Sequence, residues 1–250
     1  MKLKVAVVTG AGRGIGKAVA QILLRNNYNV VLTGRNEEPL KASFGECDVD
    51  QSRGLCVAAD VRNRSDVDRL FALTLDKFGR VDVVFNNAGI SAPPVEIDDL
   101  DINDWQAVID TNITGSFLCA RKAFSIMKKQ RPKGGRIINN GSISAYAPRP
   151  NSVPYTVSKH AISGLTRCLA LDGRKHNIAC GQIDIGNAHT EMAAPLGNGT
   201  MQANGEIVGE PLMDIDHVAT SVLHMAELPL DANILFMNVM ATKMPFVGRG

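Results

Sequence analysis

Short runs of β-branched and other apolar residues recur along the chain, and most are followed by longer stretches in which apolar positions have helical spacing. Runs of this length are typical of strands that are buried on both faces of a sheet. The predicted strands are Val5–Thr9, Val30–Thr33, Gly54–Ala58, Val81–Phe85, Arg136–Asn140 and Ile178–Ile183, with a further candidate at Ile234–Val239. The predicted helices are Gly16–Asn26, Asp66–Phe78, Trp105–Lys129 and Val153–His176.

This alternation of strands and helices predicts the fold class. Parallel strands need helical crossovers on the faces of their sheet, and right-handed crossovers give an α/β, Rossmann-like, doubly wound parallel sheet. A chain of 250 residues is long enough for one well-cored domain and short for two. Because no repeat or low-complexity linker divides it, we expect a single domain over residues 1–250.

One stretch departs from this rhythm. Between Gly186 and Pro211 the chain is rich in glycine, proline and small or polar residues. The stretch follows the sixth predicted strand, where a doubly wound sheet opens at its carboxyl edge. Long, weakly patterned segments in compact domains are usually functional lids or disordered. We expect a substrate lid over about 186–212, with plain flexibility as the alternative.

Composition narrows the class of protein. The net charge of +2 does not indicate a basic surface for binding nucleic acid. No apolar run approaches the ~20 residues that a membrane span needs. The first eight residues lead as a strand into a glycine motif and do not have the pattern of a signal peptide. Five cysteines without CxxC spacing indicate reduced thiols, and so a cytoplasmic protein.

A glycine motif directly follows the first predicted strand. Thr9 to Gly16 reads TGAGRGIG, with glycines at Gly10, Gly14 and Gly16. Glycine allows a tight turn and a close backbone approach to a pyrophosphate, and the N-terminus of the next helix offers unpaired N–H groups and a positive dipole end. In this strand–loop–helix context the motif predicts a dinucleotide cradle, whereas an ordinary tight turn is the weaker alternative.

The end of the second predicted strand indicates which dinucleotide binds. An acidic residue there would favour NAD through the ribose 2′-OH, but this strand ends Thr33-Gly34-Arg35. Arg35 can pair with a 2′-phosphate and stack on adenine, and Arg13 in the glycine loop supplies a second cation. We therefore predict NADP(H); the alternative is that Arg35 is a plain surface residue.

A candidate proton-transfer group lies further along the chain. Tyr155 and Lys159 are four residues apart and so share one face of a helix, and Ser142 ends the fifth predicted strand. A free phenol has a pKa near ~10, and about 4 kcal/mol of stabilisation would bring such a group to neutrality. A nearby ammonium favours the phenolate, and a serine hydroxyl can donate a hydrogen bond to a substrate oxygen. This grouping predicts hydride-transfer chemistry at a carbonyl or alcohol.

Together these motifs resemble the short-chain dehydrogenase/reductase family, from the glycine loop to about Thr190. The resemblance implies a tetrad of Asn112, Ser142, Tyr155 and Lys159, in which Asn112 holds a water of the proton relay. Lys159 and Tyr155 would also contact the cofactor. The further cofactor residues that the resemblance implies are Ile15 in the glycine loop, Asp60 and Val61 near the adenine, Asn87, Ala88 and Gly89 of the NNAG motif, and Gly186 and Thr190 after the sixth strand.

Two positions depart from the family pattern. Many members have Asn-Pro-Gly after the sixth strand, where this chain has Asp184-Ile185-Gly186, and Ser-Ser or a similar pair before the family serine, where it has Asn140-Gly141. The departure after the sixth strand affects the expected position of the nicotinamide. The departure at Asn140-Gly141 changes the local turn before Ser142. Candidate substrate contacts are Ser144, His189 and Met192, with ordinary loop or packing roles as alternatives. Arg149 and Asn151 are weaker candidates for reading an anionic or polar substrate.

The sequence thus predicts an NADP(H)-dependent oxidoreductase that interconverts a carbonyl compound and a secondary alcohol, with Tyr155 as general acid/base. A 3-oxoacyl-carrier-protein reductase would share every motif, and a non-catalytic NADPH sensor would keep the cradle without turnover. The expected partner is a small-molecule substrate, without nucleic acid, membrane or metal. The family resemblance implies a homotetramer or homodimer built on the two long predicted helices.

Overall fold

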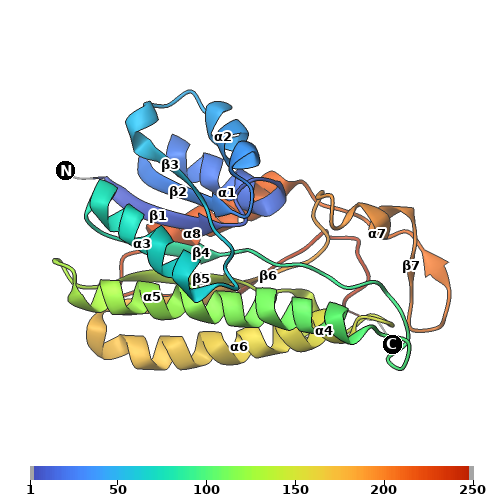
Figure 1. The fold of residues 1–250 in the computed structure, drawn as a ribbon. Helices are drawn as coiled ribbons and strands as arrows, with labels where there is room; N and C mark the ends of the chain where they lie inside the picture. Colours follow the sequence, from blue (N-terminus) through green and yellow to red (C-terminus); the bar gives the residue numbers. More distant parts are fainter. Residues whose placement is uncertain (1–2, 248–250) are drawn as a thin grey trace.

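Seven parallel strands form one sheet in the order β3-β2-β1-β4-β5-β6-β9 (Figure 1). The computed structural model describes residues 3–247, the side chain of Pro195 apart, so residues 1–2 and 248–250 of the predicted domain lie outside the described residues. The strands are β1 (Lys4–Thr9), β2 (Tyr28–Gly34), β3 (Gly54–Ala58), β4 (Val83–Asn86), β5 (Gly135–Asn140), β6 (Ile178–Ile185) and β9 (Phe236–Val239). The predicted fold class, a Rossmann-like α/β sheet in a single domain, is confirmed.

Helices cover both faces of this sheet. One face carries α1 (Gly14–Arg25), α2 (Glu37–Gly45) and α8 (Ile215–Glu227), and the other carries α3 (Arg64–Phe78), α5 (Ser116–Lys129) and α6 (Val153–Gly173). Successive strand residues point to opposite faces, so Ala6 and Val8 join the first core and Val7 the second. In Figure 1, α5 and α6 lie side by side beneath the sheet.

The predicted strands all form, with shifted ends. The strand predicted at Val81–Phe85 spans Val83–Asn86, and β6 continues two residues past Ile183. This extension places Asp184 inside the strand, although the sequence pattern placed it in the loop beyond. The helices α2 and α8, and the short helix α7 (Ala194–Asn198), were not predicted. Among residues 3–247 no helix is long and apolar enough to cross a membrane.

The long helix predicted at Trp105–Lys129 is interrupted. It begins as α4 (Ile102–Val108), passes through a π-helical turn at Ile109–Gly115 and continues as α5. Such π-helical turns inside α-helices are frequently found at functional sites. This one contains Asn112, whose side chain is buried.

The predicted lid segment, residues 186–212, is folded. It contains the short helix α7 (Ala194–Asn198) and a small antiparallel pair, β7 (Thr200–Met201) with β8 (Ile207–Val208). Figure 1 shows α7 and β7 projecting at the carboxyl edge of the sheet, next to the end of the molecule where α4 begins. The segment therefore lies at the edge where parallel α/β sheets bind their ligands.

Candidate active site

The glycine loop is a tight turn between β1 and α1. A Cβ at Gly16 would overlap the carbonyl oxygen of Gly10, so the loop can close only with glycine at this position. α1 begins after Arg13 with no side-chain cap and no acidic residue in its first turn. Its first N–H groups and positive dipole end thus remain available to an anion, as a pyrophosphate site requires.

Asn87 and Thr9 join this loop to the loop after β4. The Nδ2 of Asn87 donates to the carbonyl of Thr9 at 2.9 Å, and the Oγ1 of Thr9 accepts from the backbone N–H groups of Asn87 and Ala88, each at 2.9 Å. The Oδ1 of Asn87 accepts from Asn140 Nδ2 at 2.8 Å. The NNAG segment thereby lies between the glycine loop and the end of β5.

The two candidate 2′-phosphate cations have different surroundings. Arg35 follows β2 and is exposed, and among the described residues no hydrogen bond or ion pair engages it. Arg13 instead forms a 2.8 Å ion pair with Glu191 of the lid. Asp60 is held by Arg62, whose hydrogen bond lowers the pKa of the Asp60 carboxyl. Arg35 thus presents its charge beside the end of β2, where it also acts to lower the pKa of the Asp60 carboxyl.

Ser142, Tyr155 and Lys159 occupy one region at the carboxyl edge. Lys159 is buried, its Nζ donates to the carbonyl of Asn140 at 2.8 Å, and it lies 5.3 Å from the centroid of the Tyr155 ring. The Oγ of Ser142 accepts from the N–H of Ser144 at 3.1 Å, which leaves its own proton free to donate. An ammonium therefore stands between the end of β5 and the Tyr155 ring.

Asn112 ties the π-helical turn to this region. Its Nδ2 donates to the carbonyl of Ile90 and to the Oγ of Ser158, each at 3.0 Å, and its Oδ1 accepts from the N–H of Ile90 at 2.9 Å. Ser158 in turn donates to the carbonyl of Tyr155 at 2.7 Å. The amide thus bonds to protein groups on both sides, and its predicted role of holding a water stays a prediction.

A buried carboxylate beside Ser142 was not predicted. Asp184 is 0% exposed; its Oδ1 accepts from the N–H of Ser142 at 3.0 Å and its Oδ2 from the hydroxyl of Tyr146 at 2.8 Å. Burial raises the pKa of Asp184, against hydrogen bonds that favour the charged form. Burial, with a smaller effect of Asp184, also raises the pKa of Tyr146 to about 12. Polar residues at Gln182 and Asp184, two apart in an otherwise apolar strand, are the sequence signal for this pair.

The remaining cofactor candidates lie around the glycine loop and the adjoining segments. Thr190 approaches Gly14, and the backbone N–H of Gly186 donates to Val239 at 2.8 Å. Val61 is buried against Gly115 of the π-helical turn, and Gly89 lies next to the amide of Asn112. Ile15 packs against the core beneath α1. Their predicted contacts with a dinucleotide stay predictions.

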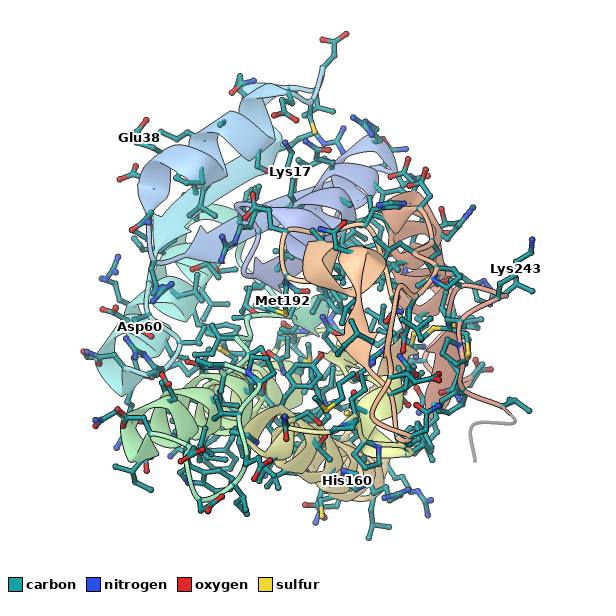
Figure 2. All side chains as sticks on the ribbon, turned by 90° about the vertical axis from the view of Figure 1, so that its right-hand side faces the viewer. Lys17, Glu38, Asp60, His160, Met192 and Lys243 are labelled. Atoms are coloured by element: carbon teal, nitrogen blue, oxygen red, sulfur yellow. The ribbon has the colours of Figure 1, made fainter. Side chains whose placement is uncertain are left out.

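The three candidate substrate residues have different positions. Met192 is 51% exposed and lies near the centre of the carboxyl edge, in front of the sheet (Figure 2). Ser144 is buried and contributes its backbone N–H to Ser142. His189 is exposed and lines a pocket of about 340 Å³ with Lys17 and Asp216, and no residue of the predicted tetrad lines that pocket. Figure 2 also places His160 at the outer edge of this view.

Arg149 anchors the lid. Its Nη2 donates to the Oε2 of Glu210 at 2.5 Å and to the Oδ1 of Asn187 at 2.8 Å, and Gln202 donates to the other Glu210 oxygen at 3.0 Å. Burial acts to raise the pKa of Glu210, but hydrogen bonds from Arg149, Gln202 and Asn187 outweigh it, and the pKa lies below its ordinary value. Arg149 is thus engaged by a carboxylate of the chain itself, which does not fit its suggested role in reading an anionic substrate.

No group of three or more His, Cys, Asp or Glu among residues 3–247 could hold a metal ion.

Comparison with known proteins places these features in a family. The short chain dehydrogenase family profile matches residues 4–200. A 3beta-hydroxysteroid dehydrogenase of Mediterraneibacter gnavus is 38% identical over 180 residues, which cover 72% of this chain and 64% of that relative. The match thus spans slightly less than two thirds of that relative's length. A 3-oxoacyl-[acyl-carrier-protein] reductase of Synechocystis sp. is 37% identical over 194 residues, 77% of each chain.

Solved structures agree with the fold. A 3-ketoacyl-(acyl-carrier-protein) reductase from Brucella melitensis complexed with NADH has a TM-score of 0.85 at 25% identity, covering 96% of this chain and 98% of the other. A variant actinorhodin polyketide ketoreductase with NADPH has a TM-score of 0.85 at 26% identity, covering 95% and 96%. From the family match over most of its length, the chain belongs to the short-chain dehydrogenase family.

Proposed function

We propose that this protein is an NADP(H)-dependent oxidoreductase that interconverts a carbonyl compound and a secondary alcohol. The observation that carries the proposal is the position of Lys159, a buried ammonium 5.3 Å from the ring centroid of Tyr155. Lys159 forms no ion pair among the described residues, although its charge acts to lower the pKa of Asp184. Its ammonium can therefore also stabilise a phenolate at Tyr155.

The proposed mechanism assigns each group one task. In carbonyl reduction the hydroxyl of Tyr155 gives its proton to the substrate oxygen, and in alcohol oxidation the phenolate takes it back. Ser142 donates its free Oγ proton as a hydrogen bond to the same oxygen. Lys159 stabilises the phenolate, and Asn112 holds α6 against the loop at Ile90. When bound, the nicotinamide supplies or accepts the hydride.

The residues present fit a phosphorylated dinucleotide. The uncapped start of α1 suits the pyrophosphate, while the unpaired, exposed Arg35 suits a 2′-phosphate. Arg13 could add a second contact only by leaving Glu191. Because the related solved structures hold either NADH or NADPH, the selection of NADP(H) rests on these two arginines of this chain.

A second candidate is reduction of 3-oxoacyl groups carried on acyl carrier protein, which the names of two related proteins bring forward. The lid gives a charge criterion: residues 186–212 contain no lysine or arginine, and of their three glutamates Glu191 and Glu206 are exposed, while Glu210 is buried against Arg149. Its exposed side chains include Met192, Met201 and Ile207. An acidic, partly apolar rim favours a neutral, apolar carbonyl compound over a substrate on an acidic carrier.

The setting proposed for this activity is cytoplasmic, with a small-molecule substrate and assembly as a homotetramer or homodimer. The five cysteines are unpaired, as in a reducing compartment. The faces of α5 and α6 expose Phe117, Val157 and Leu171, apolar side chains that a second copy would cover.

The first experiment is fluorescence titration of NADPH and NADH against the wild type and Arg35→Ala. NADPH should bind more tightly to the wild type, and the variant should lose about 10- to 100-fold of that affinity, the value of charge-assisted hydrogen bonds of about 1.5–3 kcal/mol. Arg25→Ala is the matched control, because Arg25 is also exposed but lies at the opposite end of α1. Equal affinity of the wild type for NADH and NADPH would contradict the cofactor assignment.

The second experiment is turnover, followed as NADPH oxidation with aliphatic, aryl and steroid ketones and with 3-oxoacyl thioesters, free and carrier-bound. Reduction of apolar ketones by the wild type and loss of that activity in Tyr155→Phe would support the proposal. Activity with the carrier-bound thioester alone would favour the second candidate. Tight NADPH binding without turnover of any compound would favour a sensor.

A further inference from the structure

A chain of buried hydrogen bonds connects the Ser142 backbone to α6. The Oδ1 of Asp184 accepts from Ser142 at 3.0 Å and from Gln182 Nε2 at 2.6 Å, and Gln182 Nε2 also donates to the Oγ of Ser163 at 3.0 Å. Ser163 lies on α6 and donates to the carbonyl of Lys159 at 3.3 Å. The distance between Ser142 and the helix that carries Tyr155 therefore depends on a carboxylate in β6.

All the polar atoms of Asp184 are used in this arrangement. Each carboxylate oxygen accepts at least one hydrogen bond, and the second oxygen holds the hydroxyl of Tyr146, whose ring is 49% exposed beside Ser142. Behind Gln182 the bonds continue through Thr166 to Asn139, both 0% exposed. Asn139 also accepts from Asn86, whose buried Oδ1 has no hydrogen-bond partner among the described residues. The side-chain polar atoms of Asp184, Gln182 and Thr166 are all bonded, and this favours one arrangement of these residues.

Gly141 explains how the carboxylate reaches this position. A Cβ at Gly141 would overlap the Oδ1 of Asp184 and crowd the Nε2 of Gln182. The φ of Gly141 is not in the left-handed region, so glycine is required here by space and not by backbone conformation. The two departures from the family pattern, at Gly141 and at Asp184, are therefore coupled, because Gly141 leaves the space that the Asp184 carboxylate occupies.

We propose that Asp184 is a positioning residue that acts through Ser142: its carboxylate, admitted by Gly141, holds the backbone N–H of Ser142 and the hydroxyl of Tyr146, and so fixes where the Ser142 side chain is presented to a substrate. The expected effect on the reaction rate rests on the proposed function, whereas the expected coupling of Asp184 and Gly141 in stability does not. The positioning role predicts that loss of Asp184 lowers the rate only where Ser142 is present.

The structural consequence is tested without substrate, by the thermal midpoints of the wild type, Gly141→Ser, Asp184→Ala and the double variant. Asp184→Ala should lower the midpoint in the wild-type background and lower it much less in the Gly141→Ser background, because removal of the carboxylate relieves the closer overlap and leaves that with Gln182. Gly45→Ser is the matched control, because a Cβ at Gly45 meets open space, and its effect should add to that of Asp184→Ala. Additive effects at Gly141 and Asp184 would overturn the proposed pairing.

The kinetic consequence is tested with the apolar ketone that the wild type reduces fastest. Asp184→Ala should lower kcat by about 10- to 100-fold, the scale of a misplaced reacting group, with little change in the KM for NADPH. In a Ser142→Ala background the same change should have no further effect on kcat. Asp184→Asn should keep most of the rate, because an amide oxygen can still accept from Ser142 and Gln182 while its NH₂ group faces Tyr146.

The possible outcomes separate the two proposals. The positioning role is overturned if Asp184→Ala lowers kcat equally with and without Ser142. It is also overturned if Asp184→Asn lowers kcat as much as Asp184→Ala does. In both cases the wild type still turns over, so the proposed function stands. Absence of turnover in the wild type would instead contradict the proposed function, and the thermal midpoints would still decide whether Asp184 and Gly141 are coupled.

Discussion

The ion pair between Arg149 and Glu210 should decide how often the lid opens. Arg149→Met keeps an unbranched side chain of similar length and removes the charge. The side chain of Arg149 is 16% exposed and that of Glu210 0%, so the substitution leaves a carboxylate buried without this partner. Removal of one member of a buried pair costs about 3–5 kcal/mol. If that loss falls on the lid alone, opening becomes roughly 10²- to 10⁴-fold more frequent.

Amide hydrogen exchange measures this opening. In Arg149→Met the amides of residues 187–210 should exchange faster by that factor, while the strands of the central sheet keep their protection. Arg13→Met is the matched control, because Arg13 also links the lid to the rest of the chain but its pair with Glu191 is 70% and 75% exposed. Exposed pairs contribute little, so the control should exchange like the wild type. Equal exchange in the two variants would refute the argument from burial.

Three further predictions concern the glycine loop, pH and turnover. Gly16→Ala should destabilise the protein by about 1–3 kcal/mol, the usual cost of overpacking, and abolish NADPH binding, as measured by denaturant unfolding and fluorescence titration. Because the pKa of Glu210 is lowered in the folded protein, its stabilising effect is complete above its ordinary pKa and is lost as the pH falls through the folded value. Stability should therefore fall below about pH 4.5 more steeply in the wild type than in Glu210→Gln, and parallel curves would contradict this. Tyr155→Phe should lower kcat by about 10²- to 10⁴-fold, and an unchanged kcat would exclude Tyr155 as the proton donor.

The sheet could be predicted because its strands are buried on both faces and so appear as unbroken apolar runs. The helix α2 was missed because it is short and contains Pro39, with only Leu40 and Phe44 as large apolar residues in contact with the core. The helix α8 has a clear signal, Val218, Val222 and Met225 at helical spacing behind the N-cap Asp214, but it follows the weakly patterned lid directly.

The site could be predicted only as far as its residues belong to local motifs. Glycine spacing and the Tyr155–Lys159 pair are local, whereas Arg149 and Glu210 are 61 positions apart and Tyr146 and Asp184 are 38 apart. No periodicity in a single sequence brings such pairs together. A buried acid in a strand is expensive unless paired, so its partners are decided by packing that the sequence pattern does not contain.

In the π-helical turn at Ile109–Gly115, the direction of the Asn112 side chain depends on the number of residues in the turn. A π-turn accommodates an extra residue relative to an α-helix, and each residue rotates an α-helix by about 100°. Deletion of a single residue here would let 102–129 wind as one α-helix and would turn Asn112 away from Ser158 on α6 while the buried face of α5 kept its place. The number of residues between α4 and α5 thus determines which way Asn112 faces, so insertions and deletions should be far more harmful here than in the exposed turn at residues 203–206.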